Sequence, residues 1–295
     1  MANLKEIKRK IASVKNTQKT TNAMKLVSSA KLKRTEELAK RSRVYAAKLT
    51  ELLNEIAIKM QNASAEGIDN IYFKDAKNPK RVDLVFITAD KGLCGGFNSQ
   101  TIKSVNALIT EYQSKGAKVR LRAVGRKGVD YYKFNHIELN DEIIGLSAAP
   151  DFKTAAAFIS DVSESYVNGD TDKVIIIHNG YVNMITQELR MDQVLPIDSA
   201  NLALEAVSTS ELEVEPDDDD TLLNALVKRY IEYTMYYALI DSLAAEHSAR
   251  MQAMDAATKN AKEMVKELNV KYNKARQEAI TTELIEIISG MESMK

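Results

Sequence analysis

The sequence has few residues that break helices and almost none that form cross-links. Its 295 residues include one cysteine, four prolines, eleven glycines and no tryptophan. The lone Cys94 excludes an intramolecular disulfide and fits a reducing compartment. No apolar run reaches the roughly 18 residues that a membrane-spanning helix needs. The N-terminus also lacks the apolar core of a signal peptide. We therefore expect a soluble protein that can still attach to something in a membrane.

Net charge is absent as well, since 41 basic residues balance 41 acidic ones. A globally basic nucleic-acid binder is therefore not indicated. The balance hides an asymmetry, because the acidic residues up to Lys48 are only Glu6, Glu36 and Glu37. That end carries a net charge of about +11, which predicts an acidic partner surface.

Proline and glycine are concentrated in the middle of the chain, which indicates a long helix at each end. No glycine precedes Gly67, and none lies between Gly180 and Gly290. Apolar or small residues repeat at coiled-coil spacing from Leu4 and shift in phase at Met24 and Val27. Residues 3–60 would span roughly 85 Å as a helix, and the C-terminal helix on the order of 110 Å. We expect the two helices to pair antiparallel.

The middle of the chain alternates strand-like and helix-like patterns. Strand patterns occupy residues 81–88, 118–124, 173–179 and 184–195, and helical patterns occupy residues 98–114, 128–134 and 151–168. This alternation predicts an α/β layer with a mostly parallel sheet. The predicted fold is a long antiparallel coiled coil of the terminal helices plus a central Rossmann-like α/β domain, an α+β or α/β class. The predicted boundaries are 1–66, 67–215 and 216–295.

Few residue patterns suggest chemistry. The turn Lys91–Asn98, KGLCGGFN, follows a strand and precedes a helix, as a phosphate-binding turn does. Its spacing fits neither the dinucleotide fingerprint nor the P-loop, so a tight turn is the favoured interpretation. The three histidines make no metal-binding spacing with Cys94. The aspartates Asp217–Asp220 fit a helix cap better than a calcium loop. We expect no catalytic, cofactor-binding or metal-binding residue.

Three blocks of sequence carry a family resemblance. They are IKRKIASVKNTQKTTNAMKLVSSAKLKR from Ile7 to Arg34, ITADKGLCGGFNSQ from Ile87 to Gln100, and the stretch from Glu246 to Gly290, which ends in ITTELIEIISG. Together they resemble the gamma subunit of the F-type rotary ATP synthase, bacterial type, across essentially the whole chain. The resemblance implies a non-catalytic rotor shaft. It couples transmembrane ion flow through a c ring to conformational changes at the catalytic sites of an alpha/beta hexamer.

The resemblance also implies partners and a location. The partners are the alpha and beta subunits of the hexamer, the epsilon subunit and the c ring, with one copy of this chain per complex. Nucleotides would bind to the hexamer, nucleic acid is not a partner, and membrane association would be indirect through the c ring. The absence of a transit peptide and of the paired cysteines of the plastid form favours a bacterial protein. It would lie peripherally on the cytoplasmic face of the inner membrane.

The motif matches assign expected contact residues. Met24, in NAMKLV, matches the methionine that faces the beta-subunit lever. Beta-subunit contacts are also implied for Arg250, Arg276, Gln277 and Thr281. Arg9 and Lys10 are implied members of a basic track. A tip held in the hexamer bearing would comprise Ile280, Leu284, Ile287, Ile288 and Met291.

Two other classes of function remain open at this point. An α/β enzyme with helical arms would need converging titratable residues, and none is visible in the sequence. A coiled-coil adaptor or nucleic-acid-binding scaffold would bind polyanions in a salt-sensitive way and act independently of any ATPase. Co-purification with an ATPase particle separates both classes from the rotor shaft.

Overall fold

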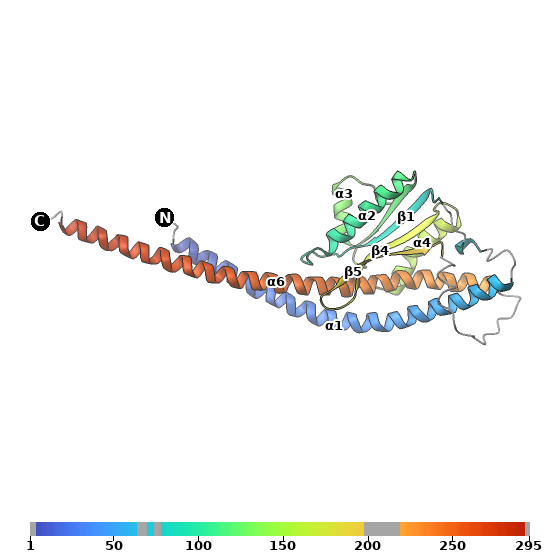
Figure 1. The fold of residues 1–295 in the computed structure, drawn as a ribbon, viewed down its shortest axis with the longest axis horizontal. Coiled ribbons are helices and arrows are strands. Elements are labelled where there is room, and N and C mark those ends of the chain that lie inside the picture. The colour runs from blue at the N-terminus through green and yellow to red at the C-terminus, as the bar shows by residue number, and fades with distance from the viewer. Residues whose placement is uncertain (1–3, 64–69, 74–77, 198–218, 293–295) are drawn as a thin grey trace. The chain divides into compact units, whose positions relative to one another are not determined.

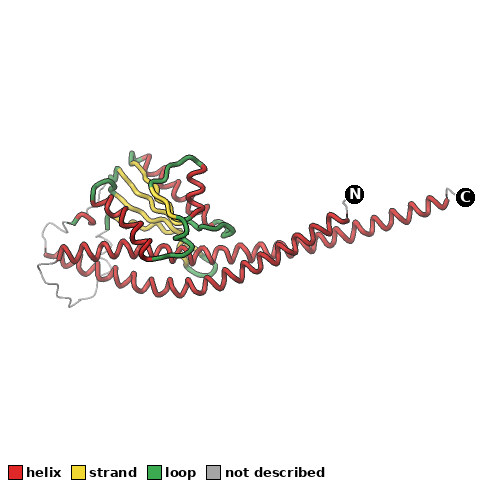
Figure 2. Tube along the Cα trace, turned by 180° about the vertical axis from the view of Figure 1, so that it is seen from behind, coloured by secondary structure: helices red, strands yellow, loops and turns green. Residues whose placement is uncertain are grey.

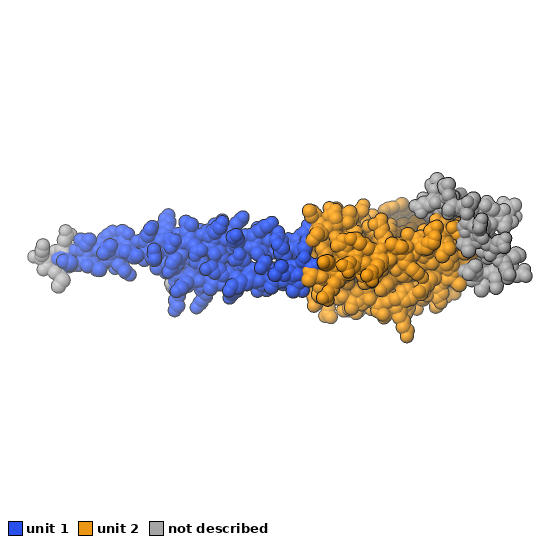
Figure 3. Space-filling view, turned by 90° about the horizontal axis from the view of Figure 1, so that it is seen from below, with its two compact units in different colours: residues 1–29, 250–295 blue, residues 30–249 orange. Residues whose placement is uncertain are grey.

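The computed structural model describes residues 4–63, 70–73, 78–197 and 219–292. It divides into two compact units, coloured in Figure 3. Unit 1 comprises residues 1–29 and 250–295, and unit 2 comprises residues 30–249. The two long helices, α1 (Leu4–Ala63) and α6 (Asp219–Glu292), contribute residues to both units. The predicted domain boundaries at 66/67 and 215/216 lie outside the described residues, so they stay predictions.

Unit 1 is a pair of antiparallel helix segments, as the coiled-coil spacing predicts. The hydroxyl of Thr258 donates to that of Thr21 at 2.8 Å, and Lys25 Nζ lies 2.6 Å from Asp255 Oδ1. Ile7 and Ile11 are buried along the seam of α1. The expected position of Val27 in this seam is wrong, because Val27 is 56% exposed. Ser28 is buried instead, so the seam advances four residues from Met24 rather than three.

Unit 2 contains a five-stranded sheet in the order β3-β2-β1-β4-β5. Its strands are β1 (Arg81–Ile87), β2 (Lys118–Val124), β3 (Asp141–Ile143), β4 (Lys173–Tyr181) and β5 (Gln187–Leu195). Neighbours are parallel except for β5, which runs antiparallel to β4. The mostly parallel sheet is therefore confirmed. The short edge strand β3 was not predicted.

Helices cover both faces of this sheet (Figure 1 and Figure 2). On one face, α2 (Phe97–Ser114) and α3 (Arg126–Phe134) pack on side chains of β1 and β2. On the other face, α4 (Phe152–Val167) and residues of α6 bury the alternate side chains of β1. Because both faces are covered, β1 consists of apolar residues apart from Arg81 and Asp83.

Helix α1 also packs on α6 within unit 2. The rings of Tyr45 and Tyr233 lie 4.4 Å apart, and the Tyr233 hydroxyl donates to the carbonyl oxygen of Ser42 at 3.3 Å. Leu53 is fully buried in the same apolar cluster as residues of α6 and α4. A short 3₁₀ helix, η1 (Ile71–Phe73), adds Phe73 to this cluster. The capping role predicted for Asp217–Asp220 falls on side chains outside the described residues.

Candidate functional site

The candidate contact residues that the sequence predicts lie on the two terminal helices, so the candidate site is a surface. In the parts of the chain that the structure describes, no group of three histidine, cysteine, aspartate or glutamate residues is arranged to hold a metal ion. Among the same residues, no helix is long and apolar enough to cross a membrane.

The glycine-rich turn Lys91–Asn98 is a structural turn between β1 and α2. Leu93 and Gly95 have φ values of 64° and 58°, which tighten the turn. The Asn98 side chain accepts a hydrogen bond from the backbone N–H of Ala89 at 2.8 Å and donates one to Cys94 Sγ at 3.2 Å. Cys94 is buried in a cluster with Ala245 and Ala249 of α6. The turn thus packs against a helix.

Met24 lies partly exposed on α1 beside a polar clamp between the two helices. The Asp255 carboxylate accepts from Lys25 at 2.6 Å and from Lys259 at 2.8 Å. The hydrogen bonds from Lys25 and then Lys259 lower the pKa of Asp255 to about 2. The Thr21–Thr258 hydrogen bond lies one turn away. The clamp fixes the register of α1 against α6 at the level of Met24.

Two exposed apolar side chains beside Met24 were missed as candidate contact residues. Leu26 and Val27 both face solvent within unit 1. The next buried position of α1 after Met24 is Ser28, four residues on, so Leu26 and Val27 lie outside the seam between the helices. Sequence periodicity alone allows a spacing of either three or four residues at this point. Leu26 and Val27 therefore add exposed apolar side chains to α1 at the level of Met24.

The expected beta-contact residues lie at two levels of α6. Arg250 is 8% exposed, so most of its side chain is covered within the chain. Arg276 and Gln277 are exposed, and Thr281 donates back to the Gln277 carbonyl oxygen at 2.9 Å. At 1.5 Å per residue, Arg250 and Thr281 are about 45 Å apart along the helix axis. The structure therefore does not bring these residues into one cluster.

The expected basic-track residues, Arg9 and Lys10, are exposed on the N-terminal turns of α1. Lys10 Nζ lies 3.3 Å from Glu6 Oε1, one turn earlier on the same helix. This exposed pair contributes little to stability. Both cations therefore remain accessible from solvent.

The last turns of α6 have no helix beside them among the residues of unit 1 that the structure describes. The register of the Thr21–Thr258 and Lys25–Asp255 contacts places Leu4 opposite about residue 275. Beyond that point α6 continues to Glu292. All five expected tip residues are exposed there, from 49% at Ile280 to 69% at Met291. Ile285, which was not among them, is 58% exposed. Contiguous exposed apolar surface of this kind marks a partner site.

Comparison with known proteins identifies the family. The family model described as ATP synthase matches residues 3–294. The ATP synthase gamma chains of a Sulfurovum species and a Nitratiruptor species are 81% and 61% identical, each over all of this chain and all of its own length. This chain belongs to the family of ATP synthase gamma chains. A gamma chain is a non-catalytic subunit of the synthase and forms its central rotor shaft.

Solved chains from the rotors of ATP synthases have a similar fold. A chain from the central stalk and c ring of the Tetrahymena thermophila mitochondrial ATP synthase matches with a TM-score of 0.60 at 27% identity. The match covers 81% of this chain and 99% of that chain. A rotor chain of the Euglena gracilis mitochondrial enzyme matches with a TM-score of 0.64 at 19% identity, over 94% and 98% of the two chains. The terminal helix pair with a central α/β domain is thus the fold of the gamma chain family.

Proposed function

We propose that the helix pair of unit 1 is the part of the shaft that turns inside the hexamer of alpha and beta subunits. Unit 2 supplies the surface for the epsilon subunit and the c ring, with one copy of the chain per complex. The complex would hold the chain peripherally on the cytoplasmic face of the bacterial inner membrane. The observation that supports the proposal best is the unpaired end of α6, with apolar side chains from Ile280 to Met291 in solvent.

The mechanism follows from the asymmetry of the helix pair. Met24 lies on α1, whereas Arg276, Gln277 and Thr281 lie on α6, so each beta subunit meets a different set of side chains. A contact that favours one beta conformation over another shifts the population of conformations in that subunit. As the shaft turns, each catalytic subunit meets each set in succession. The chain therefore contributes coupling, and the hexamer performs the chemistry.

The substitution Met24→Lys tests the proposed contact with the beta-subunit lever. The neighbouring Lys25 ammonium is held by Asp255 at 2.6 Å, whereas the new ammonium would be free to bind an acidic lever residue. A charge-assisted bond of this kind contributes about 1.5–3 kcal/mol and would form at some rotor angles only. We expect near-normal ATP hydrolysis and clearly reduced ATP-driven proton pumping in membranes that carry this variant.

Met264→Lys is the matched control, because Met264 is a half-exposed methionine of α6 in the same unit. It should leave the ratio of pumping to hydrolysis unchanged. Equal loss of both activities in Met24→Lys, or no loss of either, would rule out Met24 as a coupling contact. Purification of the ATPase particle tests the assembly itself, because the chain should appear at one copy per three beta subunits.

A further inference from the structure

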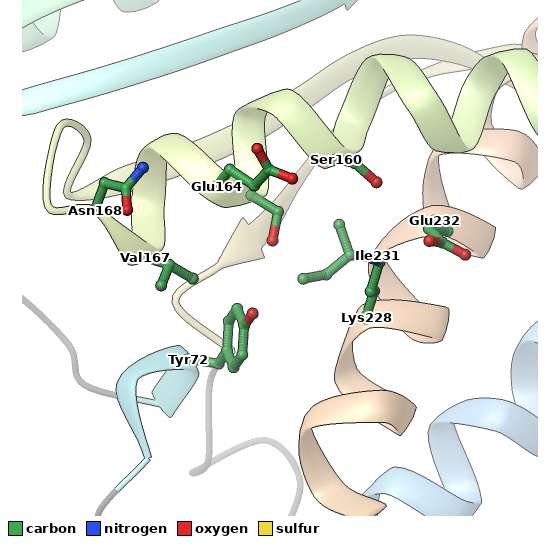
Figure 4. Close-up of a pocket in the computed structure, with 9 residues that line it drawn as sticks. Tyr72, Ser160, Glu164, Val167, Asn168, Lys228, Ile231 and Glu232 are labelled. Carbon is green, nitrogen blue, oxygen red and sulfur yellow. The ribbon is translucent and has the colours of Figure 1, made fainter. Parts of the chain in front are cut away.

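A cavity of about 320 Å³ lies within unit 2, between α4, α6 and η1 (Figure 4). It has a size typical of small-molecule sites. Its lining residues are Tyr72, Ser160, Ser163, Glu164, Val167, Asn168, Lys228, Ile231 and Glu232.

The polar side chains that line this cavity are mostly without partners. Within the described parts of the chain, six of them make no side-chain hydrogen bond or ion pair: Tyr72, Ser160, Ser163, Glu164, Asn168 and Lys228. They come from η1, from α4 and the residue that follows it, and from α6, and they line the same cavity (Figure 4). Several convergent donors and acceptors with an apolar wall are the usual composition of a ligand site.

A second cavity in unit 2 shows the contrast. It has a volume of about 570 Å³ and lies between α1, α6 and β5. Its polar groups already bond within the protein: Arg190 binds Asp241 at 2.7 Å, and Gln193 donates to the Pro196 carbonyl oxygen at 2.7 Å. Arg190 and Gln193 are therefore already engaged within the protein, whereas Glu164, Asn168 and Lys228 of the smaller cavity are exposed and available to a ligand.

The charged side chains around the smaller cavity indicate which charged groups a ligand would carry. Glu164 on α4 and Lys228 on α6 make no ion pair with each other or with another described residue. Glu232, the second carboxylate, has Arg229 at 3.7 Å. The cavity thus offers one free anion and one free cation. Val167, Ile231 and the Tyr72 ring add an apolar wall.

We propose that this cavity binds a small zwitterion of the amino-acid type with an apolar side chain. The ligand's ammonium group would bind Glu164 and its carboxylate would bind Lys228. Its hydrocarbon part would lie on Ile231 and Val167, and the hydroxyls of Ser160 and Ser163 would add hydrogen bonds. The bound molecule would join α4 to α6 and so stabilise unit 2.

L-leucine is the probe, with two matched fragments. 3-Methylbutylamine lacks the carboxylate, and 4-methylpentanoate lacks the ammonium group. Binding to the full chain and to the intact ATPase particle would be measured by ligand-observed saturation-transfer NMR, and unfolding temperature by differential scanning fluorimetry. We expect saturable binding of leucine and at least about tenfold weaker binding of each fragment, since each loses one charge-assisted contact.

Glu164→Gln and Lys228→Met should each weaken leucine binding at least about tenfold. Asp130→Asn on α3 and Lys103→Met on α2 are the control variants, because both lie on the other face of the sheet, and they should bind leucine as the parent does. Absence of saturable binding would overturn the proposal, as would leucine affinity in Glu164→Gln or Lys228→Met equal to that of the parent chain. Binding to the isolated chain that disappears in the particle would also overturn it, because a partner subunit would then occupy the cavity.

Discussion

A buried carboxylate ties α6 to the β4–β5 hairpin in unit 2, and its removal makes a sharp test of the fold. Asp241 is 3% exposed. It accepts from Arg190 Nη1 at 2.7 Å and from the backbone N–H of Tyr181 at 3.1 Å, and His178 Nε2 lies 3.3 Å away. A Cβ at Gly180 would come within 2.7 Å of Asp241 Oδ2, so the absence of a side chain there makes room for the cluster.

The substitution Asp241→Asn keeps the shape and removes the charge. An asparagine has one acceptor oxygen and one donor NH₂, whereas Arg190 and the Tyr181 amide both need acceptors. In either orientation, the NH₂ group of the new amide would face another donor, either the Arg190 guanidinium or the Tyr181 backbone N–H. In the parent chain, burial lowers the pKa of Arg190 and the Asp241 carboxylate raises it, with a net upward shift. A guanidinium stays protonated without a neighbouring carboxylate, so the cation persists after the substitution.

The magnitude follows from these contacts. Loss of a hydrogen bond to a charged group costs about 1.5–3 kcal/mol, and a buried donor left unsatisfied adds about 1–3 kcal/mol. We expect the free energy of unfolding of unit 2 to fall by about 2.5–6 kcal/mol in total. For a unit of this size, 1 kcal/mol corresponds to about 2–4 °C, so the unfolding temperature should fall by about 5–24 °C.

The assay is denaturant unfolding of the full chain, followed by near-ultraviolet circular dichroism of its tyrosines. The rate of hydrogen exchange at the Tyr181 backbone amide measures directly whether its hydrogen bond to residue 241 persists. Asp192→Asn is the matched control, because Asp192 lies on β5 with its side chain 52% exposed and 3.8 Å from His178 Nδ1. It should change stability by less than about 0.5 kcal/mol. Equal stability of the Asp241→Asn and Asp192→Asn variants would refute the reasoning.

Three further outcomes follow from the structure. Gly128→Ala should destabilise unit 2 by about 1–3 kcal/mol in thermal unfolding, because the new Cβ would lie 2.6 Å from Phe86 Cε2; an unchanged unfolding temperature would contradict this close approach. The pKa of Asp255 falls from 3.8 to about 2, so its stabilisation of the helix pair is complete above about pH 4 and lost as pH falls through 2. Hydrogen exchange in unit 1 should show this acid step, and Asp255→Asn should abolish it. Cys94→Ala should leave hydrolysis and pumping nearly intact, and a selective loss of pumping would show that the thiol has a role in coupling.

Sequence alone predicted the elements whose signal is local. The strand pattern at residues 81–88 became β1, and the pattern at 118–124 became β2 with the same bounds. The long stretches without glycine or proline form α1 and most of α6. Sequence could predict them because the absence of helix breakers is a local signal. The exposed tip near Ile280 was predictable from the lengths of the two helices. An antiparallel helix that starts at Leu4 pairs with α6 only as far as about residue 275.

The features that sequence missed depend on neighbours far along the chain. Strand β3 has three residues, Asp-Glu-Ile, and no apolar run, so only pairing with β2 defines it. Asp83 interrupts the apolar run of β1, yet it is fully buried because Arg120 and Arg122 on β2 bind it at 2.6 and 3.1 Å. That pairing requires the strand register, which no local pattern supplies. The burial of Arg250 is likewise a tertiary effect.

The strand order explains why a helix packs against the glycine turn beside the parallel sheet. Because β1 is flanked by β2 on one side and β4 on the other, the sheet has a topological switch point at their carboxyl ends, where α/β enzymes commonly bind ligands. Here the turn Lys91–Asn98 follows β1, and Tyr181 ends β4; both pack with Ala245 and Ala249 of α6. The methyl side chains of these two alanines let the helix approach closely. The crevice that holds a ligand in an enzyme therefore holds a helix in this chain, and the small residues of the turn serve that helix contact.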